Sequence, residues 1–228
     1  MFTPSKWVET TVDSTPHRRY EKPIKQSLNF IQYDVNHDGV WRRLFGNIPL
    51  GSTIGTRSTS TIRVLSMVVR VVLSMDQGLS RTPQYNYVKN CVIVYKNAPA
   101  QTNNTSLPIP SSSLPENPLI GAQSTSPKQT CFAFRNHENR GLYSFLYDRV
   151  HFMQPCPFWK VSNDAQFAPE AKYYELMFPN LDLLVTFQDD YGVQCVGDVP
   201  IIGFAGYSIY TTNVKVYVNT VFIDVDPE

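Results

Sequence analysis

Residues of the types that carry out catalysis occur in this 228-residue sequence, but none of them stands at a catalytic spacing. No GxSxG, HExxH or P-loop motif is present, so the sequence offers no activated serine, zinc-binding helix or phosphate cradle. Asp189 and Asp190 are adjacent, and neighbours on a strand point to opposite faces, so they make a poor acid–base pair. The four histidines are dispersed: His17, His37, His137 and His151. We therefore predict a protein that is not an enzyme and that needs no cofactor.

The best match to a metal site is the segment 34–39, Asp-Val-Asn-His-Asp-Gly, which resembles the first half of an EF-hand calcium loop. The twelfth position of such a loop needs a bidentate carboxylate, and here it is Phe45. An Asx-rich turn is the better interpretation. The cysteines form no CxxC pair, which argues against zinc and for reduced thiols: Cys91, Cys131, Cys156 and Cys195. We predict no bound metal.

Paired arginines beside aromatic residues are the strongest candidates for a binding function. Arginines neutralise phosphates while an aromatic ring stacks on an unpaired base. The alternative is that Arg42 and Arg43 are ordinary surface groups of a turn, with Trp41 packed in the core. Adding two nearby lysines, we predict that nucleic acid contacts Arg18, Arg19, Lys22, Lys25, Trp41, Arg42 and Arg43.

The charge distribution agrees with that prediction. Residues 1–70 carry 10 basic and 5 acidic side chains, a balance of +5, whereas residues 71–228 carry 10 and 14, a balance of −4. An electropositive N-terminal third on a mildly acidic body is suited to placing one surface against a polyanion. Scatter in surface charge is the alternative. No apolar run is long enough to span a membrane, and we expect no membrane partner.

β-Branched and aromatic residues gather in short segments separated by turn residues, and no long segment has helical periodicity. The clearest strands are Thr61–Ser74 and Val214–Val225, whose Val64, Val68, Val216 and Val218 we expect in a core. Further strands are expected at 27–35, 85–96, 142–153, 173–177 continuing into 182–188, 193–196 and 205–211, with a short segment around 41–45. This pattern predicts an all-β fold, a single eight-stranded antiparallel jelly roll with long loops.

The chain divides unevenly into an arm and a domain. Residues 1–25 are polar and weakly basic and are expected to form an N-terminal arm, and residues 26–228 to form the jelly-roll domain. Within the domain, residues 97–130 are rich in Pro, Ser, Thr and Asn, which predicts a long surface loop.

Three segments, in this order and spacing, resemble capsid proteins of the circular single-stranded DNA viruses that encode a replication initiator, the circovirus, geminivirus and nanovirus relatives. The first is Gly51-Ser-Thr-Ile-Gly-Thr-Arg57, followed by the strand from Thr61. The second, Asn139–Arg149, looks like a segment that opens a strand midway through those proteins. The third, Asn213–Asp224, looks like their closing strand.

The resemblance implies a coat protein that assembles with copies of itself, about 60 of them, into a small icosahedral shell around a single-stranded DNA genome. It also implies localisation in the virion, and in the host nucleus or cytoplasm during assembly. Most such proteins begin with a dense arginine-rich arm, which this sequence lacks. Two alternatives remain: a jelly-roll coat protein of a small RNA or satellite virus, and a non-viral ligand-binding β-sandwich.

Overall fold

The structure, a computed structural model, describes residues 22–35, 39–75, 86–102, 119–120, 131–153, 156–159, 165–168, 171–207 and 212–225. Within those ranges every regular element is a β-strand and none is a helix. The described part of the chain accordingly contains no helix that is long and apolar enough to cross a membrane.

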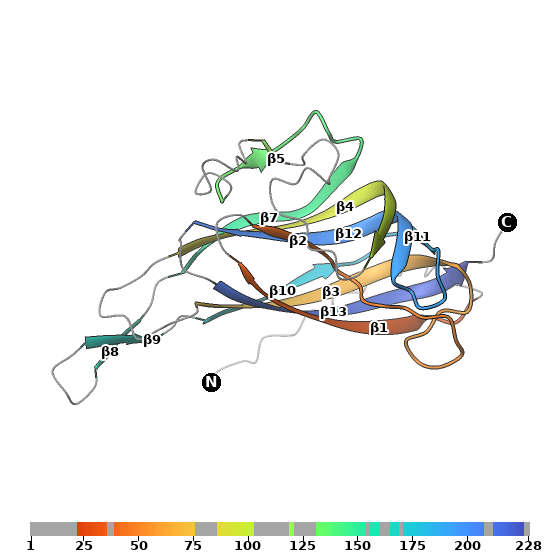
Figure 1. Ribbon diagram of the computed structural model, residues 1–228, viewed down its shortest axis with the longest axis horizontal. Helices are drawn as coiled ribbons and strands as arrows, with labels where there is room; N and C mark the ends of the chain where they lie inside the picture. The colour runs from red at the N-terminus through yellow and green to blue at the C-terminus, as the bar shows by residue number, and fades with distance from the viewer. Residues whose placement is uncertain are drawn as a thin grey trace, which may run out of the picture.

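One layer of the fold is an antiparallel sheet in the order β1, β13, β3, β10, which we call the lower sheet from its place in Figure 1. Its strands are β1 (Lys25–Val35), β13 (Thr212–Val225), β3 (Thr61–Met75) and β10 (Ala171–Phe178). These segments are dense in Val, Ile and aromatic residues, whose side chains pack well on a pleated surface.

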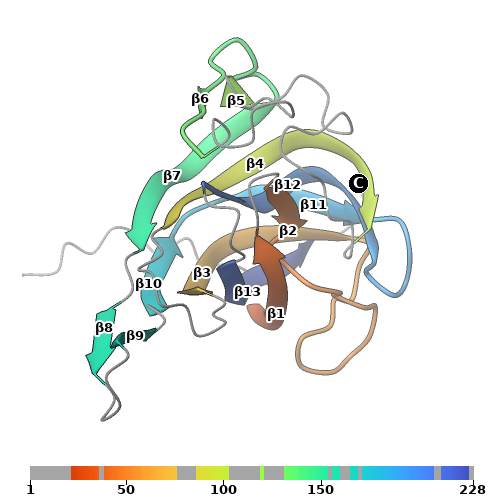
Figure 2. The same cartoon turned by 60° about the vertical axis from the view of Figure 1, so that its left-hand side comes forward.

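The second layer, the upper sheet, has the order β2, β12, β4, β7 and is also antiparallel. Its strands are β2 (Val40–Arg43), β12 (Gln194–Gly206), β4 (Asn86–Thr102) and β7 (Tyr143–Met153). Figure 2 shows the two layers facing each other, with β7, β4 and β12 above β10, β3 and β13.

The chain passes back and forth between the two sheets. It enters the lower sheet with β1, β3, β10 and β13, and the upper sheet with β2, β4, β7 and β12. Eight strands in two four-stranded layers with this order form a jelly roll, so the predicted fold is confirmed. A ninth strand, β11 (Leu183–Phe187), pairs with β3 on one side and β12 on the other, and so joins the two sheets at one end (Figure 1).

The hydrophobic core lies between the sheets and contains three of the four valines expected there: Val64, Val216 and Val218. The prediction for Val68 is wrong, because this side chain is half-buried on the outer face of the lower sheet. A bulge in β3 leaves Leu65 without a partner on β13. From there on the inward and outward positions exchange, because side chains alternate along a strand.

β12 is one strand where the sequence predicted two, at 193–196 and 205–211. Gly197 and Pro200 suggest a break between them, but Gly197 occupies a bulge with φ of 98°, after which pairing with β4 resumes. A Cβ at Gly197 would lie 2.6 Å from the carbonyl oxygen of Leu184, so only glycine fits there.

β4 also differs from its prediction, since it ends at Thr102 and not at Lys96. The additional residues pair with the bulged start of β12. The start of the predicted loop 97–130 is therefore strand. Residues 103–118 and 121–130 of that loop lie outside the described residues, so its exposure stays a prediction.

Two short hairpins were not predicted. One pairs β5 (Leu119–Ile120) with β6 (Phe134–Arg135), and the other pairs β8 (Cys156–Trp159) with β9 (Ala165–Ala168). Strands this short carry too little alternation to be recognised in a sequence.

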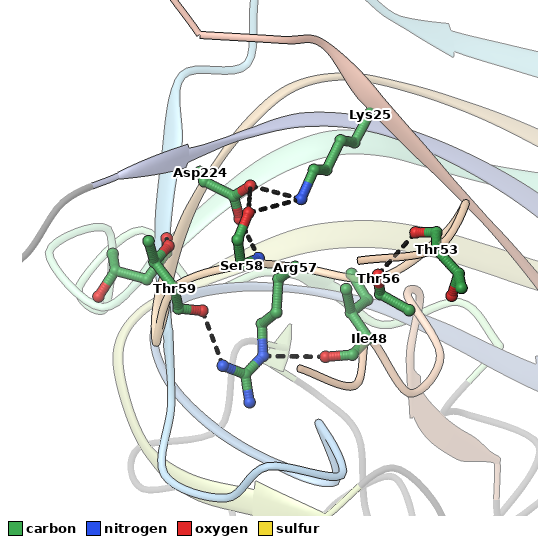
Figure 3. A network of polar contacts seen from close by, with 9 residues as sticks. Lys25, Ile48, Thr53, Thr56, Arg57, Ser58, Thr59 and Asp224 are labelled. Carbon is green, nitrogen blue, oxygen red and sulfur yellow. Dashed lines mark hydrogen bonds and ion pairs between the residues drawn. The ribbon is translucent and has the colours of Figure 1, made fainter. Parts of the chain in front are cut away.

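A buried arginine connects the loop before β3 to the turn after β11. Arg57 is 2% exposed, and its guanidinium lies 4.7 Å from the ring centroid of Phe187. It donates hydrogen bonds to the carbonyl oxygens of Ile48 at 2.9 Å and Thr59 at 2.7 Å (Figure 3), and to that of Asp189. One side chain thus satisfies main-chain acceptors in the loop before β3 and in the turn after β11.

Replacing Arg57 with Leu is expected to lower the free energy of unfolding by about 3 kcal/mol or more, because three carbonyl groups lose their donor. Urea unfolding followed by fluorescence measures the loss. The matched control is Arg63→Leu, which removes a surface ion pair to Asp182 with side chains 39% and 56% exposed. The control should cost less than about 1 kcal/mol. Equal losses in the two variants would contradict the structural role of Arg57.

Candidate functional site

The residues predicted to bind nucleic acid lie before and in β1, and in β2. Arg18 and Arg19 are outside the described residues, so their part in binding stays a prediction. Lys22 is half-buried and precedes β1. The other four each contact residues elsewhere in the chain: Lys25, Trp41, Arg42 and Arg43.

Trp41 belongs to the core. Its side chain is 1% exposed, and its ring lies against the main chain of Gly203, where an added Cβ would come within 2.4 Å of ring atoms. A base cannot stack on this ring unless β2 leaves the upper sheet. The predicted stacking role of Trp41 is therefore incompatible with the structure, and the alternative, packing in the core, is what it shows.

Arg43 is also buried and is engaged by other parts of the chain. Its guanidinium donates to the Sγ of Cys195 at 2.7 Å and to the carbonyl oxygens of Phe45 and Gly192, each at 3.3 Å. Burial lowers the pKa of Arg43, and contact with Cys195 opposes that shift. An arginine stays protonated in proteins. The charge is thus directed at the turn before β12, and a contact between Arg43 and phosphate does not fit the structure.

Lys25 is neutralised by an acidic partner on β13. Its Nζ lies 2.6 Å from Oδ2 of Asp224 and donates to the Oγ of Ser58 at 2.8 Å (Figure 3). Ser58 in turn donates to Asp224 through its N–H at 2.9 Å and its hydroxyl at 2.7 Å. Burial alone would raise the pKa of Asp224, but the bonds from Lys25 and Ser58 outweigh it and lower the pKa. The charge of Lys25 is therefore used in a contact that stabilises the fold.

Arg42 is the described arginine of the predicted set that reaches the surface. It is half-buried on β2, and its guanidinium carbon lies 5.6 Å from the ring centroid of Tyr33. It lines a polar cleft of about 570 Å³ between β1 and β2, together with Asn29, Gln32, Asn47 and the buried, hydrogen-bonded Arg43. This cleft opens where the two sheets meet at their β1 and β2 edges. A cation over an aromatic ring beside amide groups is suited to holding an anion.

Those of the predicted residues that the structure describes do not gather into one basic patch. Arg42 contacts Tyr33, which is eight residues from Lys25 on the same strand. At about 3.3 Å per residue, these positions are about 26 Å apart. Alternation along β2 could have shown part of this from the sequence, because it places Arg43 on the same face as Trp41 and Arg42 on the opposite face.

The exposed apolar side chains of the lower sheet were not predicted from the sequence. Leu28 and Phe30 belong to the strand expected at 27–35, and both are exposed on the outer face of β1. The missed signal is that β1 has apolar residues at even positions as well as at odd ones, such as Ile31 and Tyr33. A strand with only one buried face usually shows polar residues on the other.

The described residues contain no group of three or more His, Cys, Asp or Glu side chains that could hold a metal ion. Residues 36–38 of the EF-hand-like segment are outside them, so the absence of a metal stays a prediction. Three cysteines are buried free thiols: Cys91, Cys131 and Cys195. Burial raises the pKa of each, to about 11 for Cys131.

No family model matches this chain, and no curated protein matches it. Among solved structures, it is similar to the 60-mer capsid protein of BFDV, a circovirus, with 9% identity and a TM-score of 0.26 over 91% of this chain and 98% of that chain. VP1 of Trichodysplasia spinulosa-associated polyomavirus, solved with sialylated glycooligomers, is 11% identical, with a TM-score of 0.22 over 86% of this chain and 93% of that one. Both are viral capsid proteins. TM-scores this low do not establish a common fold, so the jelly-roll assignment depends on the strand order.

The two neighbouring arginines are expected to differ in their effect on stability. Arg43→Gln should lower the free energy of unfolding by about 2 kcal/mol, because buried acceptors lose a charged donor. Arg42→Gln, at the half-buried position, should cost less than about 1 kcal/mol. Thermal melting of the two single variants checks this. If the Arg43 variant is as stable as the wild type, Arg43 is not needed for the fold and again becomes a candidate for contact with nucleic acid.

Proposed function

We propose that this protein is a structural coat protein that assembles with copies of itself into an icosahedral shell around single-stranded DNA, and that it is not an enzyme. The observation that carries the proposal is the strand order of the two four-stranded sheets, β1-β13-β3-β10 and β2-β12-β4-β7. Viral capsid domains, lectins and cupins use such jelly rolls, so the fold narrows the function without fixing it. A cupin-type enzyme would need a cluster of His and Glu ligands, which is not found among the described residues.

The segments that resemble those capsid proteins support the proposal by their structural roles. The first ends at Arg57, which holds the loop before β3, and the residue after it, Ser58, bonds to Asp224 at the end of the third segment. The second segment runs into β7, where Asp148 is paired with Lys89 at 2.7 Å. Each of the three segments therefore contributes a contact that stabilises the jelly roll.

For the DNA contact, the described residue that fits best is Arg42. It combines a half-buried guanidinium, an adjacent ring and a polar cleft. Binding to phosphate alone makes no base-specific contact, so it suits packaging of a genome of any sequence. Arg18, Arg19 and Lys22 remain further candidates from the basic N-terminal third.

Particle formation tests the proposed assembly. The purified protein is expected to form closed spherical particles of uniform size, visible by negative-stain microscopy, and to sediment far faster than a 26.0 kDa monomer. Nuclease treatment followed by extraction identifies the packaged strand. DNA would support the proposal, whereas RNA would favour a small RNA or satellite virus. A protein that stays monomeric under all assembly conditions would favour a ligand-binding β-sandwich.

Replacing Arg42 with Gln is expected to weaken binding of single-stranded DNA without preventing shell formation. Loss of one phosphate contact should reduce the slope of log K against log salt by about 0.7. Fluorescence anisotropy with a labelled oligonucleotide at several salt concentrations measures both quantities. Arg63→Gln, which removes an exposed cation from β3, is the matched control. Unchanged affinity and slope in the Arg42 variant would place the DNA contact elsewhere.

A further inference from the structure

The outer face of the lower sheet carries large apolar side chains that no described element covers. Five of them stand on three of its four strands and are 46–81% exposed: Leu28 and Phe30 on β1, Tyr217 on β13, and Tyr173 and Met177 on β10. In Figure 1 this face points downward, away from the upper sheet. Scattered exposed apolar residues are normal, but a contiguous group on one sheet face is not.

The strand register places four of these side chains in two neighbouring rows across the sheet, and Tyr173 in the row after them. Leu28 is opposite Asn219, which is opposite Val68, which is opposite Met177. In the next outward row, Phe30 is opposite Tyr217, and their ring centroids are 4.9 Å apart. A hollow of about 400 Å³ lies between the two rows. The face therefore combines projecting side chains with a depression.

The size of this face is close to what a stable contact between proteins needs. With about 150–250 Å² for each large side chain, the five exposed ones present on the order of 600 Å². A stable interface buries about 800 Å² on each partner, and the half-buried valines of the same rows supply further area. Aromatic residues, Met and Arg are also the types enriched at such interfaces.

The charges on this face are balanced. Arg70 is paired with Glu175 at 2.5 Å, and Asp34 accepts a hydrogen bond from Asn213 at 2.9 Å. With Lys215, the four outward rows that begin at Leu28, Phe30, Gln32 and Asp34 carry two cations and two anions, a net charge of zero. A polyanion gains no net attraction from a neutral face, because charge neutralisation supplies most of its non-specific binding. A second copy of the same neutral face, by contrast, meets no net repulsion.

We propose that the outer face of the lower sheet is a contact surface between copies of this chain. The proposal rests on the proposed shell function and specifies one of the surfaces through which the shell assembles. Leu28 and Met177 stand at opposite edges of the sheet in one row, so they mark the width of the contact. Burial of the apolar rows against a neighbouring copy is what stabilises it.

The test introduces charges, negative in one variant and positive in the other, at the two ends of the row that runs from Leu28 to Met177. The variants are Leu28→Glu with Met177→Glu, and Leu28→Lys with Met177→Lys. Both positions are solvent-exposed, so melting temperatures should stay close to that of the wild type. The control pair is Ile54→Glu with Tyr191→Glu, at positions that are 99% and 77% exposed and outside this face. Sedimentation velocity and negative-stain microscopy of protein freed of nucleic acid give the concentration needed for assembly.

The expected result is that the Glu pair and the Lys pair each raise this concentration at least tenfold, while the control pair leaves it unchanged. If the Lys pair assembles normally and binds a single-stranded oligonucleotide more tightly while the Glu pair loses both, the face binds nucleic acid and the proposal is overturned. Normal assembly of both pairs, or equal loss in the control, also overturns it and leaves the shell function intact. A wild-type protein that never assembles overturns the shell function as well.

Discussion

The arrangement of the two sheets depends on buried guanidinium groups at one end of the sandwich. Arg57 and Arg43 come from different segments, and both donate to the turn between β11 and β12. That turn has to be fixed, because β11 pairs with β3 of the lower sheet and its neighbour β12 lies in the upper sheet. A main-chain turn with unpaired buried carbonyl groups would be unstable. The two arginines supply two of its donors, and so they tie this turn to β2 and to the loop before β3.

The same requirement explains why so few cations are left for a polyanion. Among the predicted binding residues that the structure describes, Arg43 and Lys25 are committed to partners within the chain. Lys89 and Arg135 likewise share the carboxylate of Asp148. Folding and nucleic-acid binding thus draw on the same residue types. In this chain the fold uses two of the four described cations of the predicted set, Lys25 and Arg43.

The sequence predicted the elements that alternation and β-branched residues specify strongly. β3 and β13 were placed to within two residues at each end, and the jelly roll followed from the number of strands. What could not be predicted depended on distant partners. The bulge that turns Val68 outward forms only in pairing with β13, and the burial of Arg43 depends on acceptors from a segment far along the chain. Charge alone could not distinguish an arginine that faces a surface cleft, such as Arg42, from one that bonds to groups inside the fold, such as Arg43.

The buried thiols have a consequence for chemical durability. Oxidation, disulfide exchange and alkylation all proceed through the thiolate. With a pKa of about 11, Cys131 is ionised in only about one molecule in a thousand at pH 8. The same burial shields Cys91 and Cys195 from dissolved oxidants. Oxidation and cross-linking at these three positions should therefore be slow for as long as the chain stays folded.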